Sequence, residues 1–133
     1  MASKFGYVLK ISKHGDIRRE AFKPDASLEQ LQRAVDGLIE RVEIPAFIRW
    51  GLKCDCYVDE EGLLKDAPVL NIAVSEMACR AIVGDAVLCM HDGKGESHGI
   101  PAALCRKLAS FAKGAYACGV VRRMRVRPAE RNG

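Results

Sequence analysis

The segment SLEQLQRAVDGLIE, residues 27–40, constrains the fold of this chain more than any other stretch. Ser27 and Gln30 have the spacing of a capping box, in which a hydroxyl and an amide side chain satisfy the first free backbone amides of a helix. Apolar residues then recur three and four positions apart, which places them on one helical face. We therefore predict one long amphipathic helix whose apolar face consists of Leu28, Leu31, Ala34, Val35, Leu38 and Ile39.

Strand patterns surround this helix. Residues 4–13 alternate apolar and polar side chains, and a turn at His14-Gly15-Asp16 leads into a second, more polar strand over 16–22, which together predict a hairpin. Residues 52–58 and 86–90 also favour strands, with Cys54, Cys56 and Val58 on one face of the first of these. Pro45 makes 44–50 an irregular or edge strand, and 72–81 fits either a short helix or a buried stretch.

The C-terminal part has a helical pattern followed by an arginine-rich one. Pro101 is suited to the first turn of a helix that we expect to end near Gly114. The alternation in GVVRRMRVRP predicts an edge strand or tail. The expected fold is α+β: a small, mostly antiparallel sheet with an N-terminal hairpin, one long amphipathic helix and a C-terminal helix. Residues 1–119 form the domain and 120–133 the arginine-rich strand or tail.

Length and composition favour one soluble domain. The 133 residues are 49% hydrophobic, and no apolar run reaches the roughly 18 residues of a membrane span. The N-terminus lacks the apolar core of a secretory signal, which predicts a cytoplasmic protein. Four of the six cysteines lie among apolar residues and are expected to be reduced and buried: Cys79, Cys89, Cys105 and Cys118.

The net charge of +4 is confined to the last segment, which holds five arginines and one glutamate after residue 119. Arginines of this kind could neutralise nucleic-acid phosphates, or could simply solubilise an exposed edge. The candidate nucleic-acid contacts are Arg122, Arg123, Arg125 and Arg127.

Catalytic and metal signatures are weak. Cys54 with Cys56, and Cys89 with His91, could converge on zinc from two strands, but structural zinc sites use wider spacings, and no metal is expected. No serine or cysteine has a recognised nucleophile motif. The carboxylates of 59–61 are explained by a turn. We expect no cofactor, and a binding protein is favoured over an enzyme.

The most suggestive stretch is the loop CMHDGKGESHG, residues 89–99. It lacks the spacing of a P-loop, yet Lys94, two histidines and glycine-softened amides precede a helix N-terminus, an arrangement that favours anions. The alternative is a mobile surface connection. Trp50, the only tryptophan, follows Arg49 and could stack on a base or anchor a core or interface.

Three segments carry a family resemblance when taken together: SLEQLQRAVDGLIE (27–40), YVDEEGLLKDAPVLN (57–71) and AIVGDAVL (81–88). In this order they resemble an uncharacterised family of phages and mobile elements, catalogued as domain of unknown function 3846. The resemblance covers roughly residues 5–113. It implies a hairpin, a capped helix and a C-terminal helix, and a setting in which small proteins counter host defence.

The resulting hypothesis is a phage-type anti-defence protein that sequesters an anionic nucleotide immune signal, such as a cyclic nucleotide or an ADP-ribose derivative, without chemistry. It would act in the bacterial cytoplasm as a homo-oligomer. One alternative is a nucleic-acid- or protein-binding inhibitor of host defence, and another is an enzyme that cleaves the signal. The candidate ligand contacts are Arg49, Trp50, Asn71, His91, Lys94 and His98.

Overall fold

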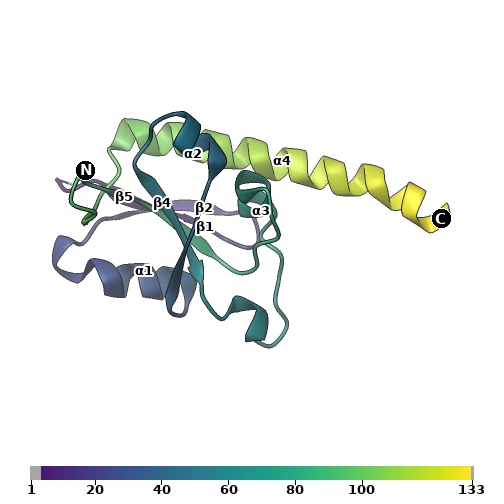
Figure 1. Ribbon diagram of the computed structural model, residues 1–133, viewed down its shortest axis with the longest axis horizontal. Coiled ribbons are helices and arrows are strands. Elements are labelled where there is room, and N and C mark those ends of the chain that lie inside the picture. The colour runs from purple at the N-terminus through teal and green to yellow at the C-terminus, as the bar shows by residue number, and fades with distance from the viewer. Residues whose placement is uncertain (1–3, 133) are drawn as a thin grey trace.

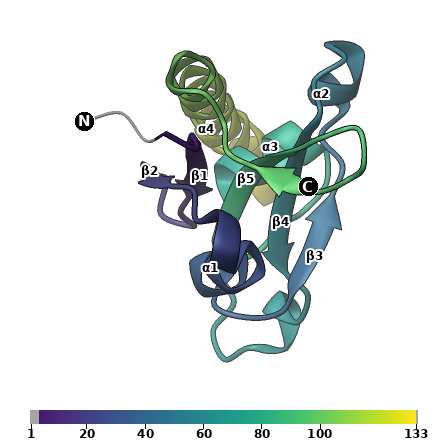
Figure 2. The same ribbon diagram turned by 90° about the vertical axis from the view of Figure 1, so that its left-hand side faces the viewer.

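The computed structural model describes residues 4–132, and the side chains of residues 4–125. The fold is built around an antiparallel sheet with helices on both faces (Figures 1 and 2). The strand order is β2-β1-β5-β4-β3, with the short β6 paired to the end of β5. The predicted α+β class is confirmed.

The N-terminal hairpin is confirmed. Strands β1 (Tyr7–Ile11) and β2 (Ile17–Ala21) pair with Tyr7 opposite Ala21 and Ile11 opposite Ile17. The turn between them contains Gly15 at φ 92, a left-handed conformation that favours glycine. β1 also pairs with β5 (Ala86–His91), so the hairpin forms one side of the sheet and β2 is its edge strand.

The helix predicted over residues 27–40 is shorter in the structure than its apolar pattern indicated. After a 3₁₀ turn, η1 (Pro24–Ala26), helix α1 spans Ser27–Val35 and ends at Asp36, which is left-handed at φ 57. The chain then forms β3 (Ile39–Val42), an edge strand paired with β4 (Cys54–Asp59). The expectation that the helix continues to residue 40 is wrong because Leu38 and Ile39 lead into a strand.

The predicted capping box does not form. The N-cap residue is Ala26, and no side chain caps the helix. The buried Gln30 instead accepts a hydrogen bond from the Lys23 amide at 2.9 Å and donates to the Ala21 carbonyl at 2.8 Å. It thereby fastens α1 to the end of the hairpin.

Two more segments differ from the prediction. Residues 44–50 form helix α2 (Pro45–Arg49) rather than an edge strand, with Pro45 in the first turn, where a missing amide costs nothing. After η2 (Gly62–Leu64), residues 72–78 form helix α3 (Ile72–Ala78). Of the two readings offered for that segment, the helix is therefore confirmed.

Helix α4 (Ala102–Asn132) follows β6 (Ser97–His98) and is far longer than expected. It does not stop near Gly114, and residues 120–132 continue it, so the predicted C-terminal strand is wrong. In Figure 1 its last part projects past the rest of the fold. Among the described residues, no helix is both long enough and apolar enough to cross a bilayer.

Two cores lie on opposite faces of the sheet. The larger packs α3, α4 and α2 against the sheet, and includes Ile11, Cys56, Leu88 and Leu108. The smaller packs Leu31 and Val35 of α1 against the other face. The faces of β4 are as predicted, since Cys54, Cys56 and Val58 belong to the larger core while Tyr57 packs against the smaller one.

Candidate functional site

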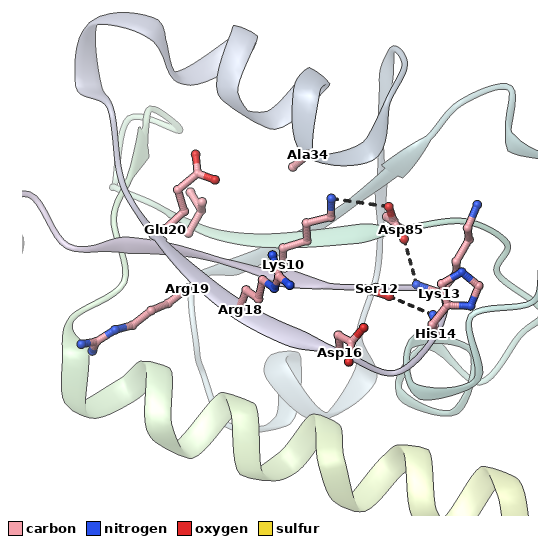
Figure 3. Close-up of a pocket in the computed structure, with 11 residues that line it drawn as sticks. Lys10, Ser12, Lys13, His14, Asp16, Arg18, Arg19, Glu20, Ala34 and Asp85 are labelled. Atoms are coloured by element: carbon pink, nitrogen blue, oxygen red, sulfur yellow. Dashed lines mark hydrogen bonds and ion pairs between the residues drawn. The ribbon is translucent and has the colours of Figure 1, made fainter.

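A concave surface with converging charges lies on the α1 side of the N-terminal hairpin (Figure 3). This basic groove has a volume of about 480 Å³. Val8 and Ala34 supply apolar surface, and the β1–β2 turn closes one end. The other lining residues are Lys10, Ser12, Lys13, His14, Asp16, Arg18, Arg19, Glu20 and Asp85.

Two like charges face each other across the strands that line this groove. Lys10 of β1 is the direct partner of Arg18 of β2, and directly opposed side chains lie on the same face of a sheet. Asp85, from the turn before β5, lies 3.5 Å from the Lys10 ammonium and compensates one of the two charges. No ion pair to Arg18 is present among the described side chains, so the groove holds a cation that an anion could neutralise.

The β1–β2 turn positions further polar groups at the rim. The Asp85 carboxylate accepts a hydrogen bond from the Lys13 amide at 2.8 Å, which fixes the turn against the rest of the sheet. The Ser12 hydroxyl accepts one from the His14 amide at 2.9 Å. The Lys13 and His14 side chains are thus carried on a braced turn at the rim (Figure 3).

None of the residues predicted as ligand contacts lines this groove. Part of the signal for it lies in the hairpin, but the exact register is also needed. The turn is centred on residue 14 and pairs Lys10 with Arg18, whereas the predicted turn, centred on Gly15, would pair Lys10 with Glu20.

The glycine-rich loop is a hairpin turn between β5 and β6, and the carboxylate of Asp92 within the loop accepts hydrogen bonds from the loop's backbone amides. Asp92 accepts hydrogen bonds from the amides of Lys94 at 2.8 Å and Glu96 at 3.0 Å. These bonds lower the pKa of the Asp92 carboxyl below its usual value. The backbone amides that we predicted to bind phosphate are therefore already hydrogen-bonded to a carboxylate. Lys94 lies on the exposed part of the turn.

Arg49 and Trp50 lie at the end of α2, away from the groove. Trp50 is 56% exposed, and its ring packs edge-on against Phe111 of α4, with centroids 5.1 Å apart. Phe47 completes this aromatic cluster at 6.0 Å from Trp50. Trp50 is therefore a rigid, partly exposed aromatic surface on the α4 side of the molecule.

Asn71 is a structural residue. Its side chain is completely buried, caps α3 by accepting from the Val74 amide at 3.1 Å, and donates to the carbonyls of Ile11 and Gly84. The Asn71 side chain therefore links α3 to β1 and to the segment that precedes β5. Since it has no accessible surface, the prediction that Asn71 reads a ligand is not retained.

The predicted nucleic-acid contacts do not form one free surface. Arg122 and Arg123 both pair with Glu76 of α3, at 3.3 and 3.4 Å. Arg125 is exposed beside Cys118 and Val121. Arg127 lies in α4 beyond the residues whose side chains are described.

His91 and His98 have different surroundings. His91, at the end of β5, lies 2.8 Å through Nδ1 from the Asp55 carboxylate. His98 is exposed, and its Nδ1 lies 3.0 Å from the Gly99 carbonyl. Asp55 was not predicted as a functional residue. Its strand partner is Cys89, which lies two residues before His91 on β5, so the pairing of β4 with β5 places Asp55 near His91.

The cysteines do not form a metal centre or a reactive thiol pair. Cys54 and Cys56 face the larger core, whereas Cys89 faces the smaller one. Burial raises the pKa of Cys56 to about 12 and that of Cys89 to about 11. Cys79 and Cys118 are exposed, which corrects the expectation that they are buried. Among the described residues, no three potential ligands are grouped closely enough for a metal ion.

The fold and groove define a class of protein: a small antiparallel-sheet domain, covered on both faces, with a basic groove beside its N-terminal hairpin. The comparison with protein families then identifies it. The family "domain of unknown function (DUF3846)" matches residues 6–112, so the chain belongs to this family. No curated protein and no solved structure gives a significant match.

Proposed function

We propose that the protein binds a small anionic ligand of the nucleotide class, without covalent chemistry, in the basic groove. The opposed Lys10–Arg18 pair carries this proposal, because directly opposed like charges cost stability unless a counter-charge relieves them. A bound phosphate beside Arg18 and Lys13 would supply that charge. The volume of about 480 Å³ falls within the range typical of small-molecule sites.

The biological role that we propose is sequestration of a nucleotide immune signal, such as a cyclic nucleotide or an ADP-ribose derivative, by a phage-type anti-defence protein acting as a homo-oligomer. What supports a binding role over turnover is the chemistry of the groove. Its contacts are an ion pair and turn hydrogen bonds, and Ser12 uses its hydroxyl to accept from an amide.

The test is binding of a panel of nucleotide signals by calorimetry, followed by denaturation and mass spectrometry of the released ligand. Binding with intact release is expected. Lys13→Ala and Arg18→Ala should each weaken it about tenfold, since a charge-assisted hydrogen bond contributes about 1.5–3 kcal/mol. Arg106→Ala, which removes an equally exposed arginine from α4, is the matched control.

Trp50 provides a second readout because it is the single tryptophan. A ligand in the groove should leave its fluorescence unchanged, and Trp50→Ala should leave affinity unchanged. Strong quenching with loss of affinity in Trp50→Ala would move the site to α2, as the sequence suggested. A ligand returned cleaved would contradict sequestration, and no binding by any anionic nucleotide would contradict the proposal as a whole.

A second candidate function is nucleic-acid binding through α4, favoured by one observation. The arginine-bearing end of this helix projects from the body of the fold (Figure 1) and carries the exposed Arg125. Binding of this kind should weaken steeply with salt and disappear when residues 122–133 are removed. Binding in the groove should survive the same truncation.

A further inference from the structure

A second, smaller pocket lies at the end of the sheet where β4 begins and β5 ends. Its volume is about 110 Å³. One wall is apolar and comes mainly from α2 and the segment after it, through Phe47, Ile48 and Leu52. The opposite wall contains the polar side chains of Arg41, Asp55 and His91. It shares no lining residue with the basic groove and stands independently of the function proposed there.

The polar wall is organised around one buried carboxylate. Asp55 is 7% exposed, and buried carboxylates are costly unless they are hydrogen-bonded or paired. Its Oδ2 lies 2.8 Å from His91 Nδ1 and accepts from the Tyr57 hydroxyl at 3.4 Å. Its Oδ1 faces the Arg41 guanidinium at 3.5 Å. Three neighbours therefore hold one carboxylate in a fixed position.

This arrangement determines the chemistry of His91. An imidazole whose Nδ1 faces a carboxylate carries its proton on Nδ1, which leaves the lone pair on Nε2. The side chain is 28% exposed, so that it is reachable from solvent. A carboxylate in this position also stabilises the imidazolium that forms when Nε2 takes up a proton. His14 and His98 have no such partner: their side chains make no ion pair in the described structure, whereas that of His91 does.

We propose that His91 is a general base that activates water for hydrolysis of a small acyl ester bound in this pocket. Nε2 removes a proton from water while the water oxygen forms a bond to the ester carbonyl carbon. The bond between that carbon and the leaving oxygen then breaks, and the imidazolium returns the proton to the alkoxide. The products are a carboxylic acid and an alcohol.

The substrate class follows from the dimensions and walls of the pocket. A water molecule occupies about 30 Å³ in the liquid, so the pocket accommodates only a few heavy atoms, as in an acetyl group. Phe47, Ile48 and Leu52 suit its methyl group. Arg41 also lines the pocket and is the cation available to the negative charge that develops on the carbonyl oxygen.

Two more polar side chains lie near the Asp55–His91 pair. Glu43, between β3 and α2, lines the same pocket as Arg41, and Tyr57 reaches the same carboxylate oxygen as His91. Asp55 is a positioning residue, because it acts on the substrate only through His91. Its replacement should therefore lower kcat without changing KM.

The experiment uses p-nitrophenyl acetate as the probe and the full chain as the enzyme. Wild-type protein should release several equivalents of p-nitrophenol per chain. His91→Gln should reduce the rate of release at least tenfold, since a general base contributes about 10²–10⁴-fold. His98→Gln is the matched control and should retain it.

Asp55→Asn should lower kcat and leave KM unchanged, because Asp55 positions the imidazole and does not contact the substrate. Equal rates in His91→Gln and His98→Gln would overturn the proposal, as would release limited to one equivalent per chain. Diethyl pyrocarbonate provides the test in unaltered protein. Modification mapped by mass spectrometry to His91 should abolish turnover, whereas loss of turnover with His91 unmodified would overturn the assignment.

Discussion

Lys10 and Arg18 lie directly opposite each other on β1 and β2, and Asp85 pairs with only the first of them. Directly opposed like charges destabilise a sheet by a few tenths of a kcal/mol to about 1 kcal/mol. A groove that retains such a pair has part of its charge uncompensated in the free protein. Stability and binding should therefore respond in opposite directions to a change at this position.

Arg18→Glu should make the free protein more stable and a weaker anion binder. The new glutamate would face Lys10, which converts a repulsive cross-strand pair into an attractive one and adds about 0.5–1 kcal/mol to the free energy of unfolding. Chemical denaturation measures the first effect and calorimetry with a nucleotide the second. Arg106→Glu on α4 is the control for the change in net charge. A loss of stability in Arg18→Glu that the control does not show would mean that repulsion between Lys10 and Arg18 does not destabilise the free protein.

Asn71→Ala should be among the most destabilising single substitutions in this chain. It removes the cap of α3 together with two side-chain hydrogen bonds, a buried one to the Ile11 carbonyl and a partly buried one to the Gly84 carbonyl. A lost cap and unsatisfied buried carbonyls together cost about 2–4 kcal/mol. Urea denaturation followed by circular dichroism measures this.

Ser27→Ala is the informative comparison for Asn71→Ala. The sequence pattern assigns Ser27 the same capping role, but the structure places it inside α1 with no cap. Its replacement should change the free energy of unfolding by less than about 0.5 kcal/mol. A larger loss of stability would indicate that the Ser27 side chain does cap α1, as the sequence pattern predicts.

The Asp59–Lys65 ion pair should make part of the stability pH-dependent. Burial raises the pKa of Asp59, but the Lys65 ammonium at 2.7 Å and the Glu61 amide outweigh it and hold the pKa below its usual value. A carboxyl whose pKa is lowered by folding contributes stability above its unfolded pKa of about 3.9, and this contribution is lost as pH falls further.

Lys65→Met should therefore lower the melting temperature at pH 7. Its effect should shrink as pH falls below about 3.9, the unfolded pKa, toward the lowered pKa of Asp59 in the folded protein. Thermal unfolding between pH 3 and 7 measures the difference between the two proteins. Lys107→Met, from the exposed surface of α4, should show no such convergence. A difference that stays constant over this range would mean that the ion pair makes no net contribution.

Two glycines of α4 should respond oppositely to alanine. A Cβ at Gly114 would meet no atom within 4 Å, so Gly114→Ala should stabilise the helix by up to about 1 kcal/mol. A Cβ at Gly119 would lie 2.5 Å from Ile72 and 2.8 Å from Glu76. Crowding of this kind costs about 1–3 kcal/mol, so Gly119→Ala should be destabilising or neutral despite the gain in helix propensity. Denaturant midpoints give both values, and stabilisation by both variants would show that α3 and α4 are not in close contact.

Of the strands, those of the hairpin and β4 and β5 could be predicted because their patterns are short and locally determined. The lengths of the helices could not, because contacts distant in sequence determine them. Beyond Val35 the apolar spacing still fits a helix, but a Cβ at Gly37 would lie 2.4 Å from the Asp59 carboxylate, and the chain turns there into β3. The alternation after residue 119 looks strand-like in sequence, yet Arg122 and Arg123 pair with Glu76 along a continuing helix.

The candidate sites show the same limit. The glycine-rich loop has the composition of an anion site, but Asp92 within the loop already accepts its amide hydrogen bonds. Asn71 has the chemistry of a recognition residue and is used to join segments of the fold. The opposed pair at 10 and 18, and the Asp55–His91 contact, depend on strand pairing, which single residues do not reveal.

The position of β5 between β1 and β4 has a consequence for biosynthesis. Until the ribosome has released residues 86–91, the β1–β2 hairpin and the β3–β4 pair have no strand to join them, and each presents an unpaired edge. Exposed edges of this kind invite pairing with other chains. The nascent chain is therefore most prone to aggregation after β4 has been synthesised and before β5 can pair with β1 and β4.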